Sequence, residues 1–203
     1  DDTVLILDCG ANVESKPEYI FQNGIMGSIF VKSVKGIENP EVKLLNVGVE
    51  DAKGNDLHKE AFKLLSESSI NFTGNCEARD ICFGVCDVVA TDGFSGNVFL
   101  KGSEGVALAM MKRIKEKLTE GISAKIGALF SYEKLMELKA EFNYDDEGGA
   151  PILGLKGAVL KMHGNSKAPA VYYAIKKAIP YVENDVTGQI AAAVASNSEL
   201  CEE

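Results

Sequence analysis

The chain has 203 residues, 46% of them hydrophobic, with 21 Lys and Arg against 30 Asp and Glu, a formal net charge of −9 and a mean hydropathy of zero. A chain of this length buries roughly 70% of its extended surface when it folds, so it needs no disulfide or structural metal. We therefore expect one domain over residues 1–203. The acidic balance opposes nucleic-acid binding, which requires a basic face.

The five cysteines are odd in number and spread along the chain, which favours reduced thiols in a cytosolic protein over a secreted disulfide framework. No apolar run reaches the ~18 residues of a membrane span, and no signal peptide is recognisable. The sequence begins with Asp1 instead of Met and enters an apolar run at once. We expect it to be a fragment or a processed product.

Strand-like and helix-like runs alternate along the chain. Short apolar or β-branched runs bounded by Gly, Asn or Asp predict strands at residues 3–8, 42–46, 70–74, 87–91 and 157–162. Apolar residues at helical spacing predict helices at residues 17–34, 57–66 and 97–118. This alternation predicts an α/β fold with a doubly wound, mostly parallel sheet, helices on both faces and a ligand site beyond the carboxyl ends of the strands.

Each predicted strand is followed by a loop that contains both Gly and Asn. The loops cover residues 8–12, 46–55, 74–80, 92–97 and 163–166. Gly lets the backbone approach a ligand, Asn offers amide donors, and the following helix N-termini carry partial positive charge. Any one of these loops is read as an ordinary turn, but five at one sheet edge would form an anion-binding cradle.

The common cofactor and metal signatures are absent. The sequence contains no phosphate-binding G-x-x-x-x-G-K-[ST], no dinucleotide-binding G-x-G-x-x-G after the first strand, and no H-E-x-x-H or C-x-x-C pair. It also lacks the G-x-S-x-G turn of serine hydrolases. Cys82 and Cys86, with Cys76 nearby, are read as structural thiols in preference to a zinc site. We expect no cofactor and no metal.

Several motifs, taken together and in this order, resemble the bacterial phosphate acyltransferase family. The matching motifs are Asp8-x-Gly10-Ala11-Asn12, Asn46-x-Gly48-x-Glu50-x-x-Lys53-Gly54-Asn55, Phe72-x-Gly74-Asn75-x-Glu77-x-Arg79-Asp80-Ile81, Asp92-Gly93-Phe94-x-Gly96-Asn97-Val98-x-Leu100-Lys101-x-x-Glu104-Gly105, Tyr144 with Gly148-Gly149-Ala150-Pro151-Ile152-Leu153-Gly154, and His163-Gly164-x-Ser166.

The resemblance implies formation of acyl phosphate from acyl-[acyl carrier protein] and orthophosphate, in the synthesis of phospholipids. It implies the isocitrate/isopropylmalate dehydrogenase-like fold shared with phosphotransacetylases. The chain departs from the family at Cys9, at Ala78 where Gly is usual, and at His58 where Thr is frequent. It also lacks the family's amino-terminal Asp-Ala-Met-Gly-Gly-Asp motif, so it resembles the carboxyl-terminal part of such an enzyme.

The chemistry needs no enzymic nucleophile, because orthophosphate itself attacks the thioester. The protein must position the two substrates and stabilise an oxyanion. We expect His163 and Lys101 to act in catalysis, and phosphate to be bound by Asn12, Lys53, Asn55, Asn75, Arg79, Asn97 and Ser166. His163 is weighed against a turn residue bonded to the backbone, and Lys53 against a solvated surface lysine. His58 is expected to be exposed, and Asp92 is read as a helix cap.

Residues 112–142 differ from the rest of the chain and predict a helical hairpin. A basic run (Lys112, Arg113, Lys115 and Lys117) is followed by apolar residues at helical spacing. An apolar stripe of this kind usually lies in a core or in a dimer interface. The resemblance adds that family members are homodimers that contact the membrane peripherally, for which the hairpin is the natural candidate. The basic run is also a candidate site for the acidic acyl carrier protein, or else a solvated face.

Two other functions stay open at this stage. One is a phosphotransacetylase-like enzyme that uses acyl-coenzyme A. The other is a non-catalytic scaffold that binds phosphate or the carrier protein. The expected location is the cytoplasm, with peripheral membrane association.

Overall fold

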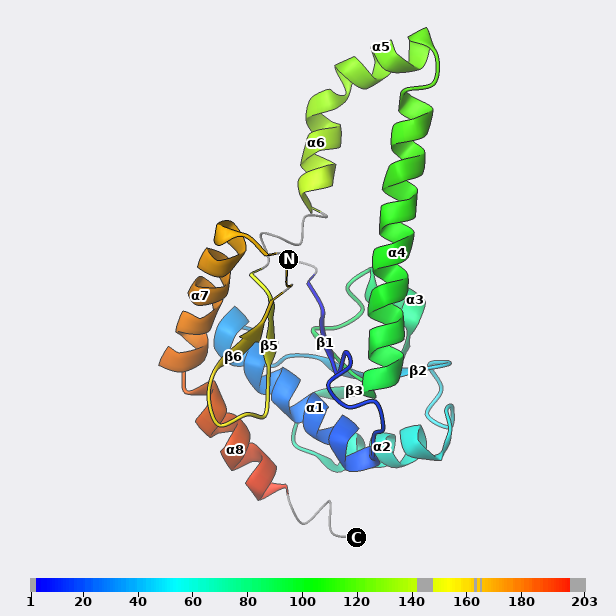
Figure 1. Ribbon diagram of the computed structural model, residues 1–203. Coiled ribbons are helices and arrows are strands. Elements are labelled where there is room, and N and C mark those ends of the chain that lie inside the picture. Colours follow the sequence, from blue (N-terminus) through cyan, green and yellow to red (C-terminus); the bar gives the residue numbers. More distant parts are fainter. Residues whose placement is uncertain (1–2, 142–147, 163, 165, 198–203) are drawn as a thin grey trace.

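The computed structural model describes residues 3–141, 148–162, 164 and 166–197. Its centre is a parallel four-stranded sheet in the order β1-β4-β2-β3 (Figure 1). The strands are β1 (Leu5–Leu7), β2 (Val42–Asn46), β3 (Phe72–Glu77) and β4 (Val88–Ala90). The first four predicted strands and the parallel α/β sheet are confirmed.

Successive residues of the central strands point to opposite faces of the sheet, and both faces are buried. Leu44 and Ala90 belong to one apolar cluster, with side chains of the helices α1 (Pro17–Phe30) and α2 (Asp56–Glu67). Leu45 and Val89 belong to another, on the opposite face, with Ile81 and two cysteines. The near-continuous apolar runs in the sequence follow from this two-sided burial.

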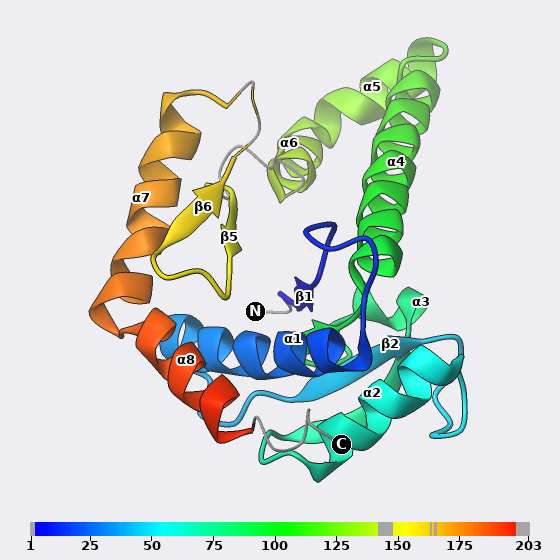
Figure 2. The same cartoon turned by 60° about the horizontal axis from the view of Figure 1, so that its bottom comes forward.

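One face is covered by three helices that pack side by side (Figure 2). They are α1 (Pro17–Phe30), α2 (Asp56–Glu67) and α8 (Val186–Ser196). Helix α1 begins with Pro17, whose missing N–H costs nothing in the first turn, and continues into a π-helical turn η1 (Val31–Lys35). Gly36, at φ 74°, ends it. The predicted helices at 17–34 and 57–66 are confirmed.

The opposite face carries the short helix α3 (Ala78–Ile81) and the base of α4 (Gly93–Leu118), which contacts the sheet through Phe99. Its 26 residues make α4 about 39 Å long, so its outer part projects from the body (Figure 1). It is followed by α5 (Ile122–Phe130) and α6 (Tyr132–Glu141). The expected hairpin at 112–142 thus falls on the outer part of α4, on α5 and on α6, while residue 142 lies outside the described range. Among the described residues, no helix is long and apolar enough to cross a membrane.

The fifth predicted strand does not join the parallel sheet. Residues of the 157–162 run form β6 (Val159–Lys161), which pairs antiparallel with β5 (Ala150–Ile152) in a separate two-stranded sheet. The helix α7 (Ala168–Glu183) follows. The expectation that five loops meet at one sheet edge was therefore wrong for the last loop. A short apolar run indicates a strand but not which strand it pairs with. Strand β5 was not predicted because it contains Pro151, and proline argues against a strand.

Strand β3 also runs beyond its predicted end at residue 74. Between Val42 and Leu44 of β2 the register shifts, because β3 has one additional residue there. Gly74, at φ 98°, lies at this irregularity. A glycine within a strand often marks such a bulge, whereas the sequence pattern indicated a strand end.

Candidate functional site

The carboxyl ends of β1 and β4 lie next to each other, and the loop after β1 folds around its own Asp8. The buried Asp8 carboxylate accepts hydrogen bonds from the backbone N–H groups of Gly10 (2.8 Å), Ala11 (2.8 Å) and Asn12 (2.7 Å). These main-chain donors are satisfied by the chain itself, so they are not available to a bound anion.

The first turn of α4 packs directly against this loop. A Cβ atom at Gly93 would overlap the carbonyl oxygen of Asn12, and one at Gly96 would overlap that of Asp8. The side chain of Asn97 lies against Gly10. Two predicted phosphate ligands, Asn12 and Asn97, are therefore brought to the same corner of the sheet edge, and both residues are exposed.

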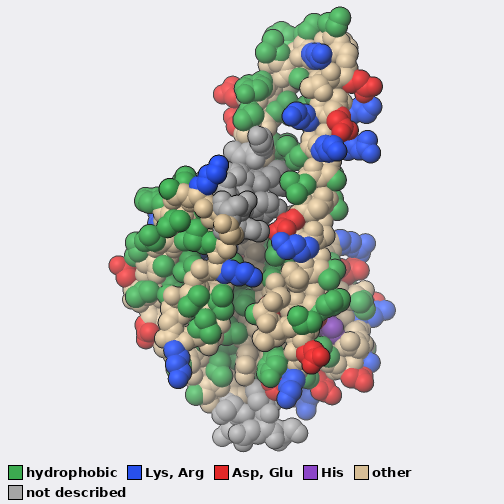
Figure 3. Space-filling model, in the orientation of Figure 1, with side chains coloured by type: hydrophobic (Ala, Val, Ile, Leu, Met, Phe, Trp, Pro, Cys, Tyr) green, Lys and Arg blue, Asp and Glu red, His purple; other side chains and the backbone are tan. Residues whose placement is uncertain are grey.

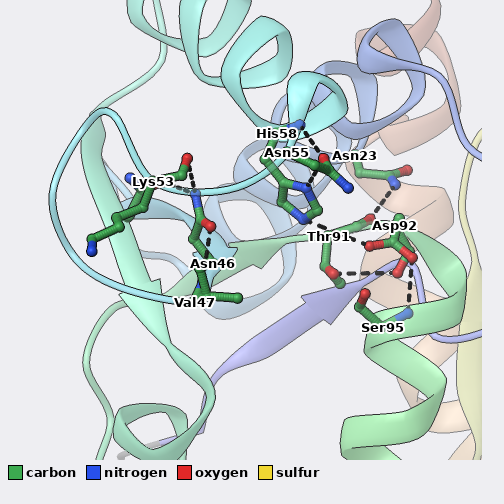
Figure 4. Close-up of polar contacts among 10 residues, drawn as sticks. Asn23, Asn46, Val47, Lys53, Asn55, His58, Thr91, Asp92 and Ser95 are labelled. Atoms are coloured by element: carbon green, nitrogen blue, oxygen red, sulfur yellow. Dashed lines mark hydrogen bonds and ion pairs between the residues drawn. The ribbon is translucent and has the colours of Figure 1, made fainter.

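A second pair of elements meets beside this corner, at the N-termini of α2 and α4. Asn55 caps α2 by accepting the N–H of His58 (3.1 Å), and Asp92 caps α4 by accepting the N–H of Ser95 (2.8 Å). The imidazole of His58 lies between the two caps, with Nδ1 2.7 Å from Asn55 Oδ1 and Nε2 3.9 Å from Asp92 Oδ2 (Figure 4). The cap role of Asp92 is confirmed. The expectation that His58 is exposed was wrong, because 16% of its side chain is accessible.

The ends of β2 and β3 are joined by two buried asparagines. Asn46 Nδ2 donates to Asn75 Oδ1 (3.2 Å) and to the carbonyl of Lys53 (3.1 Å), and Asn75 Nδ2 donates to the carbonyl of Glu50 (2.9 Å). These bonds hold the loop from Glu50 to Lys53 onto the sheet. The Lys53 side chain itself points away from His58, to the far side of Asn46 (Figure 4).

The three predicted cations have different surroundings. Lys101 pairs with Glu104 (2.7 Å), and Arg79 pairs with Glu77 (2.5 Å). In the described part of the chain, Lys53 has no carboxylate within 4 Å. Each of the two paired cations must separate from its carboxylate before it can bind an anion with its full charge.

The remaining predicted residues belong to the segment before α7. Ser166 lies in the loop that leads into that helix, which packs on η1 and α8. His163 lies outside the described residues. The structure therefore gathers Asn12, Asn55 and Asn97 into one region and places Ser166 elsewhere.

Three cysteines line the sheet and stay protonated at neutral pH. Burial raises the pKa of Cys9 to about 11, with a further contribution from the Asp8 charge, and burial raises the pKa of Cys76 to about 11 and of Cys86 to about 12. The four described cysteines are free thiols, and Cys82 is the exposed one. Within the described ranges, no group of three or more His, Cys, Asp or Glu side chains could hold a metal ion. These thiols suit packing and not nucleophilic catalysis.

Comparison with known proteins gives the family. The family model described as "Fatty acid synthesis protein" matches residues 1–189. The chain belongs to this family. Curated members named "Phosphate acyltransferase" include those of Bacillus pumilus, 50% identical over 92% of this chain and 56% of the relative, and Oceanobacillus iheyensis, 50% identical over 98% and 60%. A Geobacillus relative with the same name is 46% identical over 95% and 59%. The chain spans about three fifths of the length of these family members.

Sequence reasoning missed three residues that shape this edge. Asp8 follows β1 and Asn46 ends β2, positions that indicate the start of a functional loop, yet both side chains bind the main chain. His58 was set aside because it opens an amphipathic helix. No local pattern could have shown its contact with Asp92, since the two residues are 34 positions apart.

Proposed function

We propose that the protein containing this chain is a phosphate acyltransferase, which forms acyl phosphate from acyl-[acyl carrier protein] and orthophosphate for phospholipid synthesis. The name of the curated relatives supports the reaction type. The observation that carries the proposal is the convergence of the β1 loop and the N-termini of α2 and α4 at one sheet edge. Helix N-termini favour phosphate through their partial positive charge and their free N–H groups.

In the proposed reaction, an oxygen of orthophosphate attacks the carbonyl carbon of the thioester. A C–O bond forms, and the carbonyl becomes a tetrahedral oxyanion. The oxyanion then collapses, the C–S bond breaks, and the carrier protein leaves as a thiolate that takes up a proton. Positioning supplies much of the rate, and one donor aimed at the oxyanion is worth about 3 kcal/mol.

The structure suggests how the predicted residues divide this work. Asn12, Asn55 and Asn97 lie nearest the helix N-termini, and we assign them to phosphate binding. Lys101 lies four residues beyond Asn97 on the same face of α4, about 6 Å further along the helix, where it can face the oxyanion. His163 is the proposed proton donor to the leaving thiolate.

Four other residues of the predicted phosphate set lie farther from this corner. Lys53 points away from it, Asn75 and Arg79 belong to the β3 end, two strands from β4, and Ser166 precedes α7. Their phosphate roles stay predictions. Asn75 has a second role that its hydrogen bonds support, which is to hold the loop after β2.

The projecting helices are the proposed partner surface. On α4, Lys112 and Lys115 have no carboxylate within 4 Å in the described part of the chain, so their charges are available to the acidic carrier protein. Val106 and Met110 are more than half exposed on one face of α4, which suits a homodimer contact. Figure 3 shows hydrophobic side chains at the outer end of the protrusion, where we place peripheral membrane contact.

The fold family, the domain organisation and the cellular location are part of the same proposal. We also propose a dehydrogenase-like fold, a single domain over residues 1–203 with a 112–142 helical hairpin, and a cytoplasmic location. The parallel sheet, buried on both faces, supports the first of these.

The test is release of free thiol from palmitoyl-acyl carrier protein with and without orthophosphate, using both this chain and the natural protein that contains it. Phosphate-dependent release, with acyl phosphate trapped by hydroxylamine, is the expected result. Release from palmitoyl-coenzyme A but not from the carrier protein would change the substrate class. A folded protein that releases thiol from neither would overturn the proposal.

A further inference from the structure

Among the described residues of the sheet edge, the His58 ring contacts the capping residues of two different helices. Its Nδ1 lies 2.7 Å from Asn55 Oδ1, the cap of α2, and its Nε2 lies 3.9 Å from Asp92 Oδ2, the cap of α4. The strands that precede these helices, β2 and β4, are neighbours in the sheet. The ring therefore bridges two helix N-termini that face the same edge (Figure 4).

The hydrogen bonds of Asn55 show which nitrogen of the His58 ring is the donor. Asn55 Oδ1 also accepts the backbone N–H of His58, so this atom is an oxygen and Nδ1 must donate to it. The second nitrogen then faces a carboxylate. At 3.9 Å this contact is too long for a hydrogen bond, and the ring restrains Asp92 by occupying the space beside its carboxylate.

The contact between His58 and Asp92 matters for phosphate binding because Asp92 carries a negative charge at the same sheet edge. One of its oxygens caps α4 through Ser95, and the other faces His58, while 9% of its side chain is accessible. The next residue, Gly93, packs against Asp8 and Asn12. If the ring were removed, the second Asp92 oxygen would lose this neighbour, and its negative charge could move toward a phosphate bound at the same edge.

We propose that His58 is a positioning residue for phosphate, which acts through Asn55 and Asp92 and sets the spacing of the α2 and α4 N-termini. This inference rests on the proposed phosphate acyltransferase function. His58 does not touch the reacting atoms in this proposal. Its contribution is to phosphate affinity and not to recognition of the acyl thioester.

The test compares His58→Ala, His58→Gln and His58→Asn in the natural protein that contains this chain. Gln places an amide nitrogen where Nε2 lies, and Asn places one where Nδ1 lies, so each variant retains one of the two contacts. Lys59→Ala is the matched control, since Lys59 is exposed on the same helix. We expect His58→Ala to raise the KM for phosphate about tenfold, with the KM for acyl-carrier protein within twofold, because Asn55 and Asp92 lose the side chain that holds them in place. Gln should recover most of the loss.

A calorimetric measurement of inorganic phosphate binding by the same variants distinguishes a failure of this inference from a failure of the proposed function. If the wild-type protein binds phosphate but releases no thiol, the proposed activity fails, and a tenfold weaker affinity of His58→Ala still supports the positioning role. Equal phosphate affinities of wild type and folded His58→Ala would overturn it. Equal rises in both KM values, or no phosphate binding by the wild type, would also overturn it.

Discussion

Asn46 and Asn75 hydrogen-bond to each other through their side chains, 3.2 Å apart, across the ends of β2 and β3. Both are buried. We expect Asn46→Ala to lower the free energy of unfolding by about 2 kcal/mol, because it leaves the Lys53 carbonyl and the Val47 N–H without their partners. Urea unfolding measures this loss.

A double-mutant cycle with Asn75→Ala isolates the direct bond. The coupling energy should be about 1 kcal/mol. Asn71→Ala is the control, since its side chain makes one exposed bond to a carbonyl, and its cost should stay below about 0.5 kcal/mol. A cycle with strictly additive losses would contradict a direct interaction.

Two glycines of α4 should respond in opposite directions to the same substitution. Gly96→Ala places a methyl group onto the carbonyl of Asp8, a main-chain atom that cannot move aside, and should cost about 3 kcal/mol. Gly102→Ala meets nothing within 4 Å and should stabilise the helix by about 0.5–1 kcal/mol. Thermal unfolding of the two variants side by side checks both signs. Similar shifts would mean that the β1 loop does not pack on α4.

The buried thiols make stability fall at alkaline pH. In the unfolded chain Cys86 ionises near its ordinary value of 9.0, whereas in the folded chain burial raises its pKa to about 12. Between these values the unfolded chain binds fewer protons, so the free energy of unfolding decreases as pH rises and is fully retained below pH 9.

Denaturant unfolding between about pH 8.5 and 10.5 measures this slope. We expect Cys86→Ala to be less stable at neutral pH but to lose stability less steeply in alkali. Cys82→Ala, which changes an exposed thiol, should keep the wild-type slope. An unchanged slope for Cys86→Ala would show that other groups cause the decline.

The pair of Lys101 and Glu104 gives a prediction for activity. Lys101→Met should lower kcat/KM about 100-fold if its ammonium stabilises the oxyanion. Glu104→Gln removes its 2.7 Å partner and should leave activity at or above the wild-type level. Lys63→Met, an exposed lysine on α2, is the control. Full activity of Lys101→Met would remove Lys101 from the proposed mechanism.

The outer end of the protrusion should bind lipid. Phe130, with 87% of its surface exposed, ends α5. Phe130→Ser should weaken binding to vesicles of anionic phospholipid about tenfold, because burial of a Phe side chain is worth about 1.5–3 kcal/mol. Phe83→Ser is matched in exposure, at 86%, but lies on the body of the molecule. Co-sedimentation with vesicles compares them, and equal binding of both variants would argue against this contact.

The parts of the fold that local sequence determines were the parts that could be predicted. Strand β2 has its predicted bounds because an apolar run lies between a proline and a Gly-Asn loop. Helix α1 begins at Pro17 as expected. The partner of β6 could not be predicted, since pairing is a long-range property, and Gly74 indicated a strand end where the structure has a bulge.

In the candidate site, too, local features could be predicted from the sequence and long-range contacts could not. Asp92 was recognised as a cap because capping is decided within three residues. The contact between His58 and Asp92 joins two helices and depends on the order of the strands beneath them. The sequence also does not show that the Asp8 carboxylate accepts hydrogen bonds from the main chain of its own loop.

The strand order β1-β4-β2-β3 also constrains how the chain can assemble during synthesis. Strands β2 and β3 can pair as soon as residue 77 has been made, but β1 has β4 as its sheet neighbour, in the register Leu5 to Val88. Strand β1 can therefore pair with β4 only after residues 88–90 have been made, and these three residues lie between β1 and β2 in the sheet. A pairing over this sequence distance slows folding, because the chain between the two strands must be ordered before their contacts form.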